Sequence, residues 1–146
     1  MKTTRPLLIL LTLISVIGIS IGTYTFFHRA ATEQIYVYNC GIVDFKPTSL
    51  TQFCANAGAG VTDIEWDRWS ESGASGTGQY AINLCEPTCA DGKWKFADVK
   101  VALSRSVQDQ NKKVLSRVDL VTIDGKNLPE SSSPKLGWNL EVSAAK

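Results

Sequence analysis

The sequence predicts an all-β fold, a small antiparallel sandwich or barrel of about seven strands, preceded by one N-terminal transmembrane or signal-anchor helix. Three observations predict this fold. A charge-free apolar run lies near the N-terminus, short segments further on alternate apolar with polar residues, and turn-forming residue pairs separate these segments. Alternation indicates strands, because successive side chains of a strand point to opposite faces of the sheet.

The first thirty residues predict a membrane anchor. Residues 7–27 carry no charge, and as a helix they would extend about 30 Å, the thickness of the hydrocarbon core of a bilayer. Lys2 and Arg5 precede the run and Arg29 follows it, a distribution that keeps the N-terminus in the cytoplasm. Residues 1–30 are therefore predicted to be a cytoplasmic stub with a single-pass signal anchor in the cell membrane, and residues 31–146 an extracytoplasmic domain.

A cleaved signal peptide is the alternative. Signal peptides have a shorter apolar run, about 7–15 residues, and small residues at the cleavage site. Cleavage after Ala30 or Ala31 would place His28 or Arg29 three residues upstream of the cut, where a small residue is preferred. The sequence thus favours the uncleaved anchor, and cleavage would make the domain a secreted one.

The domain segments follow in chain order. Residues 35–39, 60–69 and 78–84 are rich in β-branched and aromatic residues, which favours strands. Trp94 and Phe96 are out of phase with the apolar positions that follow them, which predicts a bulge or bend near residues 97–98. The remaining strands are indicated by apolar residues two positions apart: Val99, Val101 and Leu103; Val118 and Leu120; Leu136, Trp138, Leu140 and Val142.

The connectors carry turn residues. Residues 70–78 (SESGASGTG) and 127–134 (NLPESSSP) are predicted to be flexible loops, and residues 49–58 are compatible with a helical turn. Four pairs have the chemistry of turns: Lys46-Pro47, Glu86-Pro87, Asp91-Gly92 and Asp124-Gly125.

Four cysteines in an exported domain predict two disulfides. We favour Cys40–Cys54 with Cys85–Cys89, because short separations keep loop closure easy and Pro87 provides a turn between the second pair. Zinc binding is disfavoured, because the spacings C-x13-C and C-x3-C do not match and no histidine lies in the domain. A redox pair would normally show the C-x-x-C spacing, which is absent.

Two groups of residues are candidates for binding or chemistry. Regular alternation would place Asp63, Glu65 and Asp67 on one face of a strand together with Trp69, and Ile64 and Trp66 on the other. Such carboxylates could act on glycans or bind Ca²⁺, although a solvated outer face over a core built from Ile64 and Trp66 is the favoured interpretation. Exposed aromatic residues could stack on sugars or peptides, although a small domain also needs them for its core. The candidate tryptophans are Trp66, Trp69 and Trp94.

Several functions are excluded or disfavoured. Serine and cysteine hydrolase mechanisms need a histidine, and the only one, His28, precedes the domain. The glycine-rich stretch at residues 75–78 lacks the lysine of a phosphate-binding loop, and no cofactor or metal site is predicted. Residues 31–146 contain 12 basic and 14 acidic residues, a net charge of −2 (12 − 14), which argues against nucleic-acid binding.

Several short motifs follow one another in a fixed order along residues 36–104. The motifs are Cys40-Gly41, Pro47, Cys54-Ala55, Ile64-x-Trp66-x-x-Trp69, Ala74-x-Gly76-x-Gly78 and Cys85-x-Pro87-x-Cys89-Ala90-x-Gly92. This ordered combination resembles a group of small secreted or membrane-anchored actinobacterial proteins, most of which have no assigned function. The resemblance implies an envelope location and disulfides, but no catalytic residues.

The sequence therefore predicts a non-catalytic, extracytoplasmic binding or interaction module of the cell envelope, with a cell-wall glycan or an envelope protein as its partner. Two alternatives stay open. One is an enzyme that acts on cell-wall glycans through the strand carboxylates. The other is a structural accessory subunit of a membrane complex, held in place by its anchor helix.

Overall fold

The computed structural model describes residue 12 and residues 14–25 and 34–141. The chain forms two compact units, residues 1–33 and 34–146. In the first unit residues 14–25 are α-helical, and no helix within the described residues is long and apolar enough to span a bilayer. Residues 7–11, 13, 26 and 27 of the predicted anchor lie outside the described residues, so the anchor stays a prediction.

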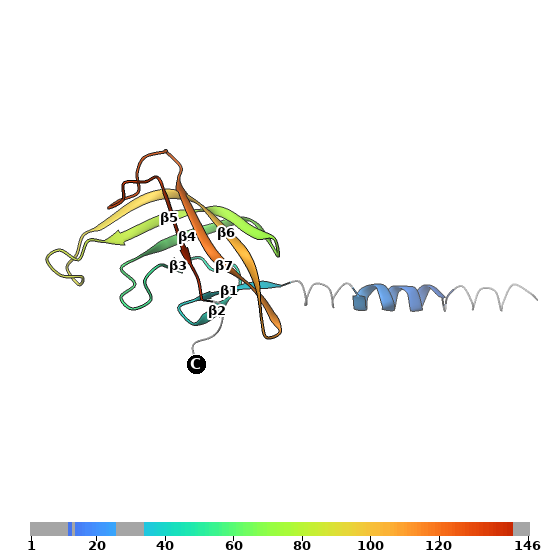
Figure 1. Ribbon diagram of the computed structural model, residues 1–146. Coiled ribbons are helices and arrows are strands. Elements are labelled where there is room, and N and C mark those ends of the chain that lie inside the picture. Colours follow the sequence, from blue (N-terminus) through green and yellow to red (C-terminus); the bar gives the residue numbers. More distant parts are fainter. Residues whose placement is uncertain (1–11, 13, 26–33, 142–146) are drawn as a thin grey trace, which may run out of the picture. The chain divides into compact units, whose positions relative to one another are not determined.

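The second unit is a β-domain built on one mixed sheet of eight strands (Figure 1). The sheet order is β2-β1-β7-β6-β5-β4-β3, and β8 pairs with β7. The predicted all-β class is confirmed for this unit, but its sheet is mixed rather than purely antiparallel and is not closed into a barrel. Its strands are β1 (Ile35–Asn39), β2 (Ile42–Asp44), β3 (Leu50–Thr51), β4 (Ala59–Ser70), β5 (Gly73–Asn83), β6 (Trp94–Asp109), β7 (Lys112–Thr122) and β8 (Lys135–Asn139).

One strand pair makes the sheet mixed. β1 runs parallel to the start of β7, with Ile35 opposite Lys113 and Tyr36 opposite Val114. β8 pairs antiparallel with the second half of β7, on the same side as β1, because β6 occupies the other side along its whole length. Parallel pairing joins segments far apart in the sequence, whereas the predicted turns specify only antiparallel neighbours.

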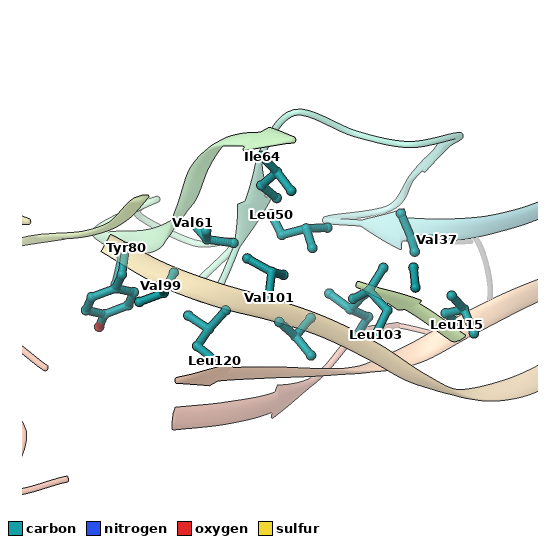
Figure 2. Packing of buried hydrophobic residues seen from close by; sticks show 14 of the residues in the cluster. Val37, Leu50, Val61, Ile64, Tyr80, Val99, Val101, Leu103, Leu115 and Leu120 are labelled. Atoms are coloured by element: carbon teal, nitrogen blue, oxygen red, sulfur yellow. The ribbon is translucent and has the colours of Figure 1, made fainter. Parts of the chain in front are cut away.

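The core lies on the inner face of this curled sheet (Figure 2). Val99, Val101 and Leu103 of β6 pack there with Val118 and Leu120 of β7, so the predicted alternation of these strands is confirmed. Further side chains from β1, β3, β4, β5 and β7, together with Leu128 of the β7–β8 loop, complete the cluster. They include Ile35, Val37, Leu50, Val61, Ile64, Tyr80 and Leu115.

The structure corrects the predicted bulge in β6. The β5–β6 register runs without interruption from Ala74 opposite Leu103 to Asn83 opposite Trp94. Trp94 and Phe96 are out of phase with the core positions because they lie on the outer face of a regular strand. They are therefore exposed, with 46% and 56% of their surface open to solvent.

The predicted flexible loop at residues 70–78 is also wrong. A two-residue turn, residues 71–72, joins β4 to β5, and β5 begins at Gly73. The small residues serve close backbone approach rather than flexibility, because a Cβ added at Gly76 would overlap the carbonyl oxygen of Glu65. By contrast, the loop at residues 127–134 is confirmed, and Phe53 O accepts a hydrogen bond from Ala57 N (2.8 Å) in the expected helical turn.

Candidate functional site

Both predicted disulfides are present. Cys40 is bonded to Cys54, at a sequence separation of 14, and Cys85 is bonded to Cys89, at a separation of 4. The preferred pairing is confirmed, and all four cysteines are oxidised. Two disulfides in a small domain are typical of an oxidising compartment.

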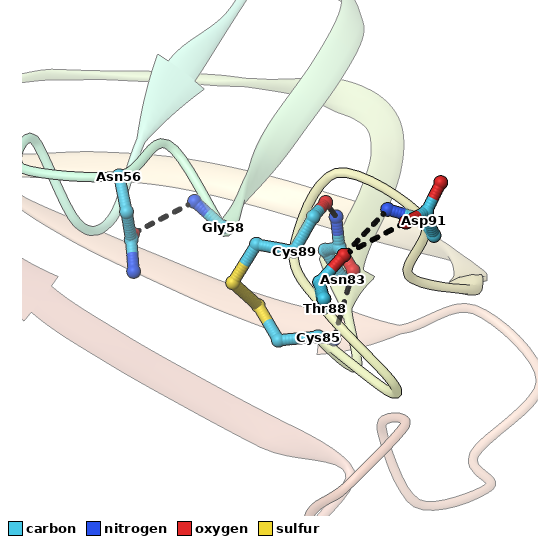
Figure 3. The surroundings of a disulfide bond; sticks show 7 residues. All are labelled: Asn56, Gly58, Asn83, Cys85, Thr88, Cys89 and Asp91. Carbon is cyan, nitrogen blue, oxygen red and sulfur yellow. Dashed lines mark hydrogen bonds between the residues drawn. A yellow bond between two sulfur atoms is a disulfide. The ribbon is translucent and has the colours of Figure 1, made fainter.

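The Cys85–Cys89 bond closes the loop between β5 and β6 (Figure 3). Asn83, the last residue of β5, organises this loop: its Oδ1 accepts the N–H of Cys85 (2.9 Å) and its Nδ2 donates to the carbonyl of Cys89 (2.8 Å). Thr88 and Asp91 exchange two further hydrogen bonds, of 3.1 and 3.2 Å. The disulfide therefore belongs to a compact structural loop.

The Cys40–Cys54 bond lies at what we call the seam, the junction where β1 meets β3 and the end of β4. Within the described residues no strand pairing joins these two ends of the sheet, and side chains bridge them instead. Asn39 accepts the N–H of Thr51 (3.0 Å) and donates to the carbonyl of Ser49 (3.2 Å). At the seam, side chains and a disulfide therefore link parts of the open sheet that no backbone ladder joins.

Trp66 and Trp69 complete the seam. Their rings meet edge to face, with centroids 4.9 Å apart, and both are half-buried against the core. The indole N–H of Trp66 donates to the carbonyl of Pro47 (2.8 Å), and that of Trp69 to the carbonyl of Ile35 (3.0 Å). Trp69 therefore shares the inner face with Trp66, and its predicted placement beside the carboxylates is wrong.

Two β-bulges in β4 explain this placement. The pairing with β5 shifts register between Thr62 and Glu65, and again between Trp66 and Arg68. Each bulge adds one residue to β4, which reverses the alternation of side chains beyond it. The second bulge turns Trp69 toward the core.

The candidate carboxylates of Asp63, Glu65 and Asp67 are all exposed. Asp63 and Glu65 line a depression of about 300 Å³ that continues over β5 to Asp98 of β6, whereas Asp67 lines a neighbouring one. Within the described residues none of the three forms an ion pair. Among the same residues, no three side chains of His, Cys, Asp or Glu lie close enough together to hold one metal ion.

Trp94 differs from the other two candidate tryptophans because it belongs to an exposed group on the outer face. We call this group, formed by Trp94, Phe96, Val121 and Ile123, the outer-face patch. Between 36% and 56% of the surface of each side chain is exposed. Large apolar residues exposed on a solvent-facing sheet surface are typical of interaction sites.

The outer-face patch borders a pocket of about 500 Å³. Phe96 and Ile123 line it together with Pro129, and the N–H of Ile123 donates to the carbonyl of Asp98 (3.0 Å), which extends the β6–β7 pairing to this point. The pocket is therefore held by a rigid strand pair on one side and by the β7–β8 loop on the other. Its polar lining residues are Lys95, Asp98, Asp124, Lys126 and Asn127.

The two cations of the pocket are neutralised by their neighbours. The Lys95 ammonium lies 2.7 Å from a carboxylate oxygen of Glu130, and the Lys126 ammonium lies 3.1 Å from one of Asp124. Hydrogen bonds from the backbone and side chain of Lys126 hold the pKa of Asp124 below its usual value, so this carboxylate stays ionised. Asp98, in contrast, has only an amide hydrogen bond from Gln79 (3.4 Å) and no ion pair within the described domain.

The sequence did not identify Phe96 and Ile123 as site residues. The signal was nevertheless present, because Trp94 and Phe96 alternate with each other but not with the core positions of β6. Two aromatic residues out of phase with the core positions can be explained by an exposed aromatic surface just as they can by a bulge.

Comparison with known proteins finds no family model, curated protein or solved structure that matches this chain.

Proposed function

We propose that this protein is an extracytoplasmic, non-catalytic binding module of the cell envelope, and that the outer-face patch is its contact surface. The observation that carries the proposal is the exposure of Phe96 and Ile123 beside a pocket, with Trp94 exposed on the same face, on a domain that fills its core from the opposite face. Exposed aromatic side chains contribute most of the binding energy at many interfaces. The two disulfides support the extracytoplasmic location.

The membrane anchor and the resemblance to exported actinobacterial proteins are part of this proposal. An anchor at residues 7–27 would hold the β-domain at the outer surface of the membrane. The partner would then be another envelope component, such as a cell-wall glycan or an envelope protein.

The geometry gives less support to the two alternatives. Hydrolysis of a glycan needs two carboxylates facing each other across a site, at about 5–10 Å. Asp63, Glu65 and Asp67 instead lie side by side along one strand, exposed to solvent. A structural accessory held by its anchor helix would make no use of the outer-face patch.

Co-sedimentation of the purified full chain, in a nonionic detergent, with cell-wall and membrane fractions tests the proposal. We expect the wild-type chain to sediment with one fraction and the Phe96→Ala variant to lose most of that binding. Asp44→Asn changes an exposed residue of β2 outside the patch and should bind normally. Equal retention of wild type and Phe96→Ala would contradict the proposal.

A further inference from the structure

We infer that the pocket at Phe96 and the acidic depression beside it form one track for an extended, positively charged peptide segment, which places one apolar side chain in the pocket. The inference rests on the proposed binding function and adds the chemical class of the partner. Three features carry it: the adjacency of the pocket and the depression, the apolar lining of the pocket, and the charge of the depression.

The pocket and the depression are adjacent, because Asp98 and Ile123 line both. From Ile123 the track crosses β6 at Asp98 and β5 at Gln79, and it reaches β4 at Glu65. Four neighbouring strands span roughly 14 Å, since adjacent strands lie about 4.8 Å apart. Four or five residues of extended chain cover that distance at about 3.3 Å per residue.

The pocket end is suited to a large apolar side chain. Phe96 and Ile123 present more than half of their surface to solvent there, and Pro129 forms part of the opposite wall. Covering these groups with an aromatic or aliphatic side chain removes apolar surface from water on both partners. The pocket volume, about 500 Å³, accommodates one such side chain together with its backbone.

The rest of the track is negatively charged. The two basic residues of the track, Lys95 and Lys126, both line the pocket, and each is already paired with a carboxylate there. Three acidic residues, Asp63, Glu65 and Asp98, line the depression without an ion pair inside the described domain, and no basic residue lines it. A ligand with lysine or arginine beyond its apolar residue would complement this charge.

The same charge argues against other occupants. Anionic lipid surfaces, nucleic acids and phosphorylated segments would be repelled by the three carboxylates. A neutral glycan would partly desolvate the carboxylates without supplying a countercharge, which is unfavourable. An extended peptide combines the apolar group and the cations at the spacing that the track requires.

Fluorescence anisotropy with defined peptides tests the inference, using the full chain in nonionic detergent. The probe is a labelled eight-residue peptide with one phenylalanine followed by three lysines separated by serines. We expect saturable binding that weakens with added salt, because the contacts are solvent-exposed ion pairs. Replacing the phenylalanine by alanine, or the lysines by glutamates, should weaken binding at least tenfold.

Two protein variants locate the contact. Phe96→Ala removes the apolar platform, and Glu65→Gln with Asp98→Asn removes two charges from the track with little change in shape. Each should weaken binding of the lysine peptide about tenfold, and the second should also reduce its salt dependence. The matched control, Asp44→Asn with Glu141→Gln, removes two exposed carboxylates elsewhere in the described domain and should leave binding unchanged.

The outcomes separate this inference from the proposed function. Absence of saturable peptide binding, or equal weakening by the control variant, would overturn the basic-peptide assignment. Binding of a chitin oligomer or of anionic vesicles that depends on Phe96 would also overturn it, while the proposed binding function would stand. Envelope co-sedimentation that is indifferent to Phe96→Ala would instead remove the proposed function.

Discussion

Two pairs of aromatic residues, Trp66 with Trp69 and Trp94 with Phe96, lie in long strands of one sheet but have opposite environments. The seam pair is half-buried, packed edge to face and hydrogen-bonded through both indole N–H groups. The second pair is exposed on the outer face of a regular strand. Residue type alone therefore does not distinguish a structural aromatic residue from a candidate contact residue.

The regularity of the strand makes the difference. β4 contains two bulges, and the second turns Trp69 inward so that both indoles reach carbonyls across the seam. β6 pairs with β5 without interruption from Trp94 to Leu103, so Trp94 and Phe96 stay on the outer face of β6, away from the core. A bulge in β6 would have buried the pair and removed the outer-face patch.

The largest expected effect concerns the seam. Trp69→Ala should destabilise the protein by about 2–4 kcal/mol, because it removes a half-buried ring from the core and a hydrogen bond to Ile35. Trp94→Ala, at an exposed position, should cost less than about 1 kcal/mol. Urea unfolding of both variants measures the difference. Equal destabilisation would mean that the two aromatic pairs have the same role.

The disulfides extend the comparison from side chains to covalent links. Replacing Cys40 and Cys54 by serine should cost about 3 kcal/mol, because their bond restricts a longer loop of the unfolded chain. The same change at Cys85 and Cys89, beside the outer-face patch, should cost about 2 kcal/mol. Urea unfolding without reductant tests the order, and a larger loss at the shorter loop would contradict it.

The smallest effect concerns Tyr80 of β5, which is buried on the inner face, whereas Phe96 of β6, paired with the next residue Ala81, is exposed on the outer face. Burial raises the pKa of the Tyr80 phenol above its usual value of 10.0. The unfolded chain therefore releases this proton first, and the stability that Tyr80 contributes is complete below pH 10.0 and is lost as the pH rises toward the folded-state pKa.

Unfolding by urea between about pH 8 and pH 11 measures this loss, whose slope for one group is at most about 1.4 kcal/mol per pH unit. The Tyr80→Phe variant should lose less stability over this range than the wild type. Tyr36→Phe, at a half-buried position in β1, serves as the control. Identical alkaline losses in the wild type and Tyr80→Phe would show that Tyr80 does not titrate on unfolding.

The sequence by itself determined the features that depend on local chemistry. Alternation gave the core positions of β6 and β7, and the short cysteine separations gave both disulfides, because these signals act over neighbouring residues. The all-β class of the domain follows from the same patterns. The three candidate carboxylates were also correctly expected to be exposed.

Only the tertiary structure decided how the strands combine. The parallel pairing of β1 with β7 joins residues almost eighty positions apart, and no turn signal specifies it. The bulges of β4 lie in its pairing with β5, where the backbone of β4 approaches Gly76 closely, so alternation along β4 alone placed Trp69 on the wrong face. The pocket beside the outer-face patch likewise forms only where Phe96 of β6 meets Ile123 and Pro129, which follow β7. The pairing of β6 with β7 brings them together.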